Sequence, residues 1–428
     1  MAEVVDKLIE KEVERQRAGL ELIPSENYVS SAVLRALGSE LTNKYSEGYP
    51  GKRYYGGQKV TDVIEQLAID EAKKLFRSNH ANVQPHSGAP ANEAVYSAWC
   101  EPGDTILAMD LSHGGHLTHG APVTRSAKLF NFIRYKMKDV STGEIDYDKL
   151  ERLALQHKPK ILLAGYSGYT RDLDYARFVK IGNKVGALLV ADIAHIAGLI
   201  AAGVKENPLD FGFHVLTSTT HKTLRGPRGG LILSQGVVSS PLKAPDKTIE
   251  NIPTLIDRAV FPGLQGGPHM NVIAAKLVAL QEASTPKFKN YAQQVLDNAS
   301  ALSSELLKHD VKLVTGGTTN HMILIDTISS FGIDGSVVER ACDEAGLTLN
   351  KNVIPDDTLP PFRPSGVRLG TPAITTRGLV DSDMGLVAKW IVQAATHSND
   401  HSLLTSIRHE VVEMAKRHPL PSDRTVGN

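Results

Sequence analysis

The sequence predicts an α/β fold made of a larger and a smaller domain. From about residue 59 onward, helical patterns alternate with short apolar segments typical of buried strands, which favours a mostly parallel sheet covered by helices. The 428 residues exceed the size of one typical core, so two domains are expected. A Ser-Thr-Pro sequence at residues 284–286 interrupts the helical pattern and predicts a break between them.

The larger domain is predicted from helix and strand patterns that follow one another. The helical patterns cover residues 60–76, 88–100, 147–156 and 175–185. The strand patterns cover residues 105–109, 160–164, 187–191, 214–217 and 231–234. In open α/β sheets ligands bind at the carboxyl ends of strands, so we expect functional residues there.

The smaller domain is predicted from the remaining patterns. A helix at 271–283 precedes the predicted break; after the break, a long helix ending near 309 is followed by strands at 311–314 and 322–325 and helices at 335–345 and 378–396. An amphipathic helix at 3–17 lacks a core of its own and should pack on something else, such as a partner subunit. We expect an N-terminal helical arm, a large domain and a small domain at residues 1–27, 28–286 and 287–428.

Composition favours a small-molecule enzyme. Lysines plus arginines equal aspartates plus glutamates at 47 each, so neither a nucleic acid nor a membrane is expected as a partner. The only cysteines, Cys100 and Cys342, exclude a disulfide framework and a cysteine-rich metal site. The first residues alternate in charge and no apolar stretch approaches the roughly 20 residues of a membrane span. We expect a cytoplasmic protein.

Lys222 is the first candidate catalytic residue. It lies in a segment of hydroxyl residues, arginines and glycines between two predicted buried strands. Burial there would lower the pKa of its amine and make it available to attack a carbonyl as a Schiff-base lysine. A solvated lysine beside a glycine turn is the alternative that this segment leaves open.

Asp192 follows the predicted strand at 187–191, on the same sheet as Lys222. A carboxylate there suits the protonated pyridine nitrogen of pyridoxal phosphate, whose ring accepts carbanion charge. A helix N-cap is the usual alternative for such an aspartate. Asp192 and Lys222 together favour the cofactor.

Two glycine-containing segments could bind the cofactor's phosphate. Ser87 and Gly88 open a helical pattern, where backbone amides and a hydroxyl can approach an anion, and Gly267 lies in a second such loop. Ordinary glycine turns are the alternative for both. The histidines at 113–119 lack a metal-binding pattern, so we expect no metal and consider a ring-stacking imidazole instead.

Two further segments carry substrate chemistry. Arg368 lies in a short strand pattern, and its guanidinium could hold an amino acid's carboxylate bidentately, or form a structural ion pair. The loop at 42–57 is rich in aromatic and titratable groups, among them Tyr45, Glu47, Tyr54 and Tyr55. Glu47 could move a proton, and a partly dry pocket would raise its pKa.

These motifs together resemble the serine hydroxymethyltransferase family of fold type I pyridoxal phosphate enzymes, which has a mostly parallel seven-stranded sheet. The resemblance covers nearly the whole chain, including residues 21–28, 44–57, 113–119, 192–195, 350–352 and the Lys222 and Arg368 segments. It implies reversible conversion of L-serine and tetrahydrofolate to glycine and 5,10-methylenetetrahydrofolate, through a cofactor aldimine on Lys222. It also implies an obligate homodimer with shared sites, and leaves open whether two such dimers form a tetramer.

The resemblance assigns roles to individual positions. Asp192 would pair with the pyridine nitrogen, His116 would stack on the ring, and His195 and Thr219 would lie near its phenolic oxygen. Other cofactor-binding positions would be Ser87, Gly88, Ser167, His221, Tyr45 and, from the other subunit, Gly267. Arg368, Ser25 and Tyr55 would hold the substrate carboxylate. The positions that bind folate or manage protons would be Glu47, Tyr54, Leu111, Gly115, Leu117 and Asn352.

The chain departs from the family pattern at Ala89 and Pro90, where many members have serine and glutamine. A phosphate-binding hydroxyl and one backbone donor are thereby lost, so Ser87 should carry more of that contact. Two alternatives to the transferase are a folate-independent aldolase of threonine-like amino acids and a binding protein that has lost its chemistry. Glu47 and residues 350–352 argue against the first, and joint retention of Lys222, Asp192 and Arg368 against the second.

Overall fold

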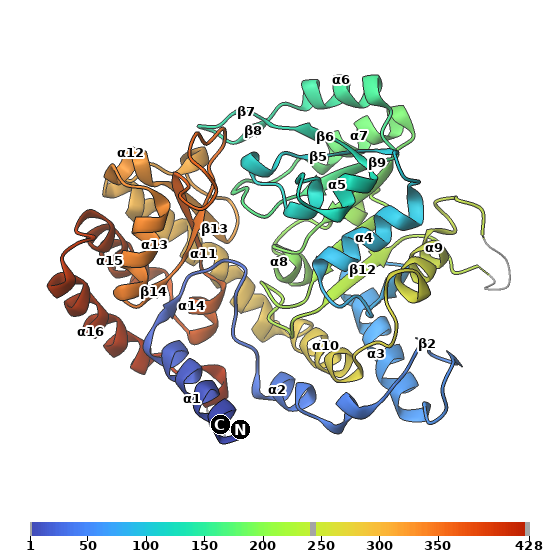
Figure 1. Ribbon diagram of the computed structural model, residues 1–428, viewed down its shortest axis with the longest axis horizontal. Coiled ribbons are helices and arrows are strands. Elements are labelled where there is room, and N and C mark those ends of the chain that lie inside the picture. Colours follow the sequence, from blue (N-terminus) through green and yellow to red (C-terminus); the bar gives the residue numbers. More distant parts are fainter. Residues whose placement is uncertain (1, 240–244, 424–428) are drawn as a thin grey trace.

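A seven-stranded sheet forms the centre of the larger part of the molecule (Figure 1). The computed structural model describes residues 2–239 and 245–423. In spatial order the strands are β4 (His80–Asn82), β12 (Gly230–Ser234), β11 (Val215–Thr219), β10 (Leu188–Asp192), β9 (Ile161–Gly165), β5 (Thr105–Met109) and β6 (Asn131–Tyr135). Only β12 runs antiparallel to its neighbours, which confirms the predicted fold class.

Helices cover both faces of this sheet. Alternate strand residues point to opposite faces, so Val190 packs with α4 (Gly88–Trp99) and α9 (Ile252–Arg258) in one core. Leu189 and Ala191 pack in the other core, with helices α3 (Lys59–Phe76), α6 (Tyr147–His157), α7 (Tyr175–Val185), α8 (Ala197–Ala201) and α10 (Met270–Ala283). Strands buried on both faces read as unbroken apolar runs, which explains why most of them were predicted.

Two of the seven strands were missed. Both β4 and β6 lie at the edges of the sheet and carry polar residues, including His80, Asn82, Asn131 and Arg134. An edge strand is paired on one side only and need not be apolar. Their sequences therefore lack the pattern that identified the central strands.

The smaller part of the chain has its own sheet and core. Strands β13 (Met322–Asp326), β16 (Gly366–Gly370) and β15 (Asn350–Asn352) pair antiparallel in that order. The helices here are α11 (Pro286–Lys308), α12 (Thr327–Phe331), α13 (Gly335–Glu344), α14 (Pro372–Arg377), α15 (Met384–Thr396) and α16 (His401–Arg417). Leu302, Val367 and Trp390 are fully or almost fully buried in the core that these elements share.

Two predictions in this region were wrong. Residues 311–314 form no strand: only Leu313 makes an isolated bridge, and the chain then turns at Thr315, whose φ is 64°. The helix predicted at 378–396 begins later, since α14 ends at Arg377, Gly378 follows with a φ of 104°, and α15 begins only at Met384. The sequence analysis also missed α16.

The N-terminal segment packs on the smaller part. Helix α1 (Ala2–Ala18) lies beside α16, and strand β1 (Leu20–Glu21) pairs with β14 (Leu347–Thr348). Four apolar side chains of α1 remain more than half exposed: Val4, Val5, Leu8 and Ile9. The division at residues 27 and 286 stays a prediction. Among the described residues, no helix has the length and apolar character needed to cross a membrane.

Short elements connect these parts. Helix α2 (Ser31–Leu37) packs on α10, and α5 (Arg125–Leu129) precedes β6. The hairpin of β2 (Gly48–Tyr49) and β3 (Lys52–Arg53) lies within the aromatic loop, and β7 (Met137–Asp139) pairs with β8 (Glu144–Ile145) beyond β6. The aromatic loop is therefore an ordered hairpin and not an extended connector.

Candidate active site

A cavity of about 340 Å³ opens at the carboxyl ends of the central strands. Asp192 ends β10 and Thr219 ends β11, and both line it. The other predicted site residues that line the cavity are Ser25, Ser87, Gly88, His116, Ser167, His195, His221, Lys222 and Arg368. Residues up to 343 positions apart in sequence thus meet in one place, from Ser25 to Arg368.

Lys222 lies in the cavity and is buried, with 8% of its surface exposed. Burial lowers the pKa of its amine to about 7, helped by the charges of Arg368 and Arg228 and opposed by Asp192. A substantial fraction of the amine is therefore unprotonated at neutral pH. The alternative of a solvated loop lysine is wrong.

Asp192 is held by three donors. The amide of Asn92 and the ring of His119 donate to Oδ2 at 2.9 and 3.0 Å, and the Ala194 amide donates to Oδ1 at 3.0 Å. Burial by itself would raise the pKa of this carboxyl, but the hydrogen bonds from His119 and Asn92 outweigh burial and keep the pKa below its usual range. Helix α8 begins only at Ala197, so Asp192 does not cap it.

His116 is oriented by the turn that follows it. Its Nδ1 accepts from the Thr118 amide at 3.2 Å and lies 2.7 Å from the Thr118 hydroxyl. Burial, with a contribution from His119, lowers the pKa of His116 to about 4, so its ring is neutral at pH 7. A neutral ring at the cavity wall can stack on an aromatic ligand without repelling a cationic ring.

His116, His119 and Asp192 bring three possible metal-ligand atoms within 4.8 Å of one another. Two of these groups bond each other, and Nδ1 of His116 bonds Thr118, so hydrogen bonding already accounts for their proximity. The sequence-based expectation that no metal binds stays a prediction.

Unused donors gather at the N-terminal end of α4. Ser87 occupies the N-cap position, but its hydroxyl makes no capping bond. The Thr219 hydroxyl and Nδ1 of His221 are buried and have no hydrogen-bond partner within the described structure. A Cβ on Gly88 would lie 2.8 Å from the Thr219 side chain, so a larger residue would displace this wall. Buried unpaired donors at a helix N-terminus suit an anion.

Arg368 reaches the cavity from β16 of the smaller part. Its Nη1 donates to the backbone oxygen of Ser167 and, at 3.2 Å, to that residue's hydroxyl, while Nε donates to Asn350 at 3.2 Å. Burial lowers the pKa of the guanidinium to about 10, which leaves it fully charged at pH 7. The cation has no carboxylate partner among the described residues, so the structural ion-pair alternative is wrong.

Nine predicted site residues do not line this cavity, and five of them lie together elsewhere. Tyr45, Glu47, Tyr54, Tyr55 and Gly267 form a second group on the aromatic loop and the segment before α10. The Tyr45 hydroxyl donates to Glu47 at 3.3 Å, and the Tyr45 and Tyr55 ring centroids lie 5.0 Å apart. A Cβ on Gly267 would lie 3.2 Å from the Tyr45 ring.

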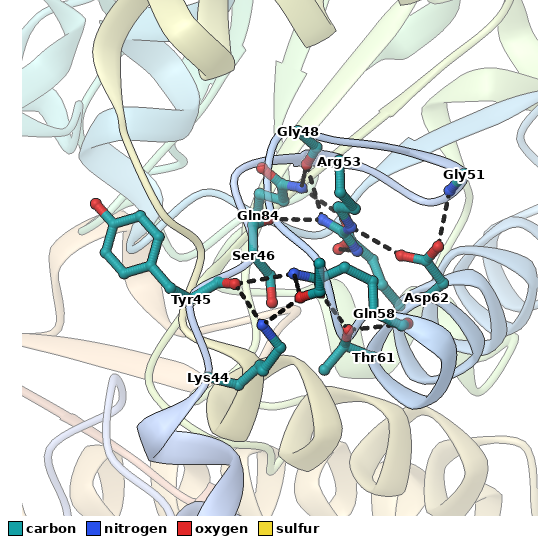
Figure 2. A network of polar contacts seen from close by, with 12 residues as sticks. Lys44, Tyr45, Ser46, Gly48, Gly51, Arg53, Gln58, Thr61, Asp62 and Gln84 are labelled. Atoms are coloured by element: carbon teal, nitrogen blue, oxygen red, sulfur yellow. Dashed lines mark hydrogen bonds and ion pairs between the residues drawn. The ribbon is translucent and has the colours of Figure 1, made fainter.

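A buried arginine holds the aromatic loop in place (Figure 2). Arg53 donates to the carbonyls of Ser46 and Gly48 at 2.9 and 2.8 Å, and pairs with Asp62 and Glu65 at 2.8 and 2.5 Å. Tyr45 and Tyr55 nevertheless remain about half exposed. The loop is therefore fixed in shape while its aromatic and carboxyl groups stay accessible.

The other four predicted residues that do not line the cavity are Leu111, Gly115, Leu117 and Asn352. Leu111 and Leu117 are exposed, and Gly115 is buried where a Cβ would come within 2.3 Å of a backbone oxygen. A Cβ placed on Gly168, the residue after Ser167, would lie 3.6 Å from the side-chain amide of Asn352. The structure therefore places Asn352 close to the cavity, although it does not line it.

Comparison with known proteins agrees with this geometry. The family model for serine hydroxymethyltransferase matches residues 1–391. A serine hydroxymethyltransferase of Acidobacterium capsulatum is 51% identical over 412 residues, covering 96% of this chain and 92% of that protein. One from Xanthomonas campestris pv. campestris is 51% identical over 414 residues, covering 97% and 96%.

The chain belongs to the serine hydroxymethyltransferase family. Members of the family depend on pyridoxal phosphate and use tetrahydrofolate as co-substrate, so the chain is a one-carbon transferase of fold type I. Nothing in the comparisons favours the aldolase alternative. The donor set fits the cofactor: an amine of lowered pKa, an ionised carboxylate and unpaired donors at the helix end line one cavity.

Sequence reasoning missed several residues of this site. His119 and Asn92 both bond Asp192, and Tyr166, Arg228 and Glu26 line the cavity. The position of Asn92 in the first half of α4 was visible, but its contact with Asp192, 100 positions later, depends on the fold. Of these missed residues, only His119 lies in a segment that the sequence analysis considered, the histidines at 113–119. Nothing in that segment distinguished His119 from His116.

Proposed function

We propose that the cavity around Lys222 is where this chain interconverts serine and glycine with tetrahydrofolate. The observation that carries the proposal is the meeting of Lys222, Asp192 and Arg368 in one cavity. These residues supply an amine of lowered pKa, a buried carboxylate and a guanidinium that has no carboxylate partner among the described residues. An amino acid and an aldehyde cofactor need those three groups.

Pyridoxal phosphate would be held by Lys222 at its aldehyde and by Asp192 at its pyridine nitrogen. When bound, it supplies an electron-withdrawing ring that can accept the electron pair left when serine loses its hydroxymethyl group. Asp192 stays ionised through His119 and Asn92, and so favours a protonated pyridine. Ser87, the Gly88 amide and His221 would bind the phosphate, and His116 would stack on the ring.

Arg368 would hold the substrate carboxylate, together with Ser25 and a tyrosine of the aromatic loop, Tyr55. Its present acceptors on Ser167 are a backbone oxygen and a hydroxyl, both neutral. A carboxylate accepts stronger hydrogen bonds from guanidinium than neutral oxygens do. Substrate can therefore replace Ser167 as the partner of Nη1 and fix the orientation of its Cα.

Glu47 would hold or move the proton at the transferred carbon, from a second copy of the chain. Within one chain Glu47 and Tyr55 lie outside the Lys222 cavity, and their loop presents exposed aromatic groups. A second copy that contributes this loop would complete the cavity, which supports a homodimer. Leu111, Leu117 and Asn352 would line the folate site, and two buried cysteines suit a cytoplasmic enzyme.

Purified protein tests the proposal. With pyridoxal phosphate bound, glycine should change the visible absorbance of the cofactor, and tetrahydrofolate should increase that change. Serine and tetrahydrofolate should yield glycine, and Lys222→Ala should lose both the absorbance and the reaction. A protein that cleaves 3-hydroxy amino acids but gives no response to tetrahydrofolate would contradict the proposal.

A further inference from the structure

Lys276 is a buried cation that the reaction described above does not use. It lies on α10 with 2% of its surface exposed. Its Nζ donates to three backbone oxygens, those of Val83 at 2.6 Å, Gly230 at 2.7 Å and Pro85 at 3.1 Å. The ammonium form of lysine has one hydrogen for each of these three acceptors, whereas the neutral amine has only two hydrogens.

Burial lowers the pKa of Lys276 to about 7, opposed by the charge of Glu65. Glu65 is itself fully buried and bonded to Arg53 and, at 2.7 Å, to Gln84. The three backbone carbonyl oxygens that accept hydrogen bonds from Nζ of Lys276 stabilise the charged form of its amine. An apolar residue at this position would cost less free energy to bury than a cation does. The presence of the lysine therefore indicates that its charge has a role.

The three carbonyls belong to the segments that frame the N-terminal end of α4. Val83 and Pro85 lie in the segment that leads directly to Ser87, the N-cap of that helix. The Pro85 oxygen also accepts from the Gly230 amide at 2.9 Å. Lys276 therefore ties the chain before Ser87 to the start of β12.

These segments meet without free space. A Cβ on Gly230 would lie 2.3 Å from the Ser87 oxygen, and a Cβ on Gly229 would lie 2.3 Å from Cε of Lys276. The Gly229 oxygen accepts the amide of Thr220, two residues before Lys222. Loss of the hydrogen bonds of Lys276 would therefore displace both Ser87 and the segment that carries Lys222.

The charge of Lys276 also acts on this end of the cavity. After burial and Lys222, it is one of the cations that lower the pKa of His221, and after burial and His269 it lowers that of His86. No carboxylate within the described residues forms an ion pair with Lys276. Positive potential thus remains on the side of the cavity where Ser87 and His221 offer donors.

We propose that Lys276 is a positioning residue for the cofactor's phosphate group. Its ammonium fixes the backbone on both sides of Ser87 and supplies positive charge behind the phosphate site. This inference rests on the proposed function, which places the phosphate at the N-terminal end of α4. It also explains how the site can tolerate Ala89 and Pro90, which remove a hydroxyl and a backbone donor from the same helix end.

The test compares two ligands that differ only in the phosphate. Dissociation constants of pyridoxal phosphate and pyridoxal are measured by equilibrium dialysis on full-length protein freed of cofactor. Lys276→Gln keeps hydrogen-bond donors without the charge, Lys276→Met removes both, and Lys276→Arg keeps the charge. Arg377→Met is the matched control, since it removes a buried cation that also donates to backbone carbonyls but does not line the cavity.

The inference predicts that Lys276→Gln and Lys276→Met weaken pyridoxal phosphate binding by about 10- to 100-fold, the size of one to two charged hydrogen bonds. Pyridoxal binding should change little, and Lys276→Arg should recover most of the preference for the phosphate ester. Arg377→Met should leave the ratio of the two constants unchanged. Equal losses for both ligands, or no recovery with arginine, would overturn the inference and leave Lys276 a purely structural residue.

The same measurements separate this inference from the proposed function. If wild-type protein binds pyridoxal phosphate no better than pyridoxal, the phosphate site itself is misplaced and the proposed function fails. If wild-type protein prefers the phosphate ester and the Lys276 variants keep that preference, only the role of Lys276 is wrong. If the phosphate site is correctly placed, Ser87→Ala should weaken the binding of pyridoxal phosphate more than that of pyridoxal, whatever the role of Lys276.

Discussion

His119 donates a hydrogen bond from Nε2 to Oδ2 of Asp192 at 3.0 Å, and the structure shows why this nitrogen carries the hydrogen. The other ring nitrogen, Nδ1, accepts the backbone amide of His116 at 3.1 Å. A neutral imidazole has one donor and one acceptor, so the amide fixes the tautomer. The turn that orients His116 therefore also holds the carboxylate of Asp192.

His119→Phe should lower kcat for serine by about 10- to 100-fold, since a hydrogen bond to a charged group contributes about 1.5–3 kcal/mol. The variant keeps the ring's volume and removes the donor to Asp192. Asn92→Ala, which removes the second donor to Oδ2, should act in the same direction. Steady-state kinetics would measure both, and an unchanged kcat in His119→Phe would show that Asp192 needs no such support.

Lys222 should capture the cofactor with a rate that rises with pH through about 7 and then levels off, because only the unprotonated amine attacks an aldehyde. Its pKa is lowered by burial, so the protonated form dominates below that pH and the free amine above it. Stopped-flow absorbance of cofactor-free protein mixed with pyridoxal phosphate measures the rate. A rate that continues to rise toward the ordinary lysine pKa of about 10.4 would contradict the burial argument.

Arg368→Lys should keep cofactor binding but lower kcat/KM for serine by about 100-fold or more. Lysine retains the charge and loses the guanidinium fork, which can make two parallel bonds to a carboxylate. Arg368→Ala should lose more. Kinetics with serine, alongside titration with pyridoxal phosphate, separates the two effects. Equal activity of the lysine variant and wild type would argue against a bidentate clamp.

Arg53→Met should destabilise the protein by about 3–5 kcal/mol, because it leaves Glu65 as a buried unpaired carboxylate. It should also raise KM for tetrahydrofolate, since the aromatic loop loses the bonds to Ser46 and Gly48. Urea unfolding and kinetics measure the two outcomes. Adding Glu65→Gln should recover part of the stability but not the KM, and recovery of both would show that the loop does not depend on Arg53.

The central strands could be predicted because they are buried on both faces and read as apolar runs. The edge strands β4 and β6 could not, because pairing on one side leaves them free to carry polar residues such as Asn82 and Arg134. The error at 311–314 has a local cause. The Gly316–Gly317 pair follows the apolar residues and turns the chain before a strand can extend.

Asp192 could be identified because it comes directly after an apolar strand pattern, and Lys222 because it is a charged residue in a short segment between two such patterns. His119 could not, since its role depends on a contact between residues 73 positions apart. Lys276 gave no signal either, because a lysine on a helix usually faces solvent. The location of Glu47 outside the Lys222 cavity of its own chain comes from the fold and not from any spacing in the sequence.

The central claim is that Lys222 of one chain works with Glu47 of another, and mixed dimers test it most directly. Lys222→Ala and Glu47→Gln chains, each inactive with serine and tetrahydrofolate, are unfolded together and refolded as a mixture. Shared sites predict that mixed dimers regain one intact site, so the mixture recovers about a quarter of wild-type activity. If each chain supplied both residues to its own site, the mixture would stay inactive and the account would be wrong.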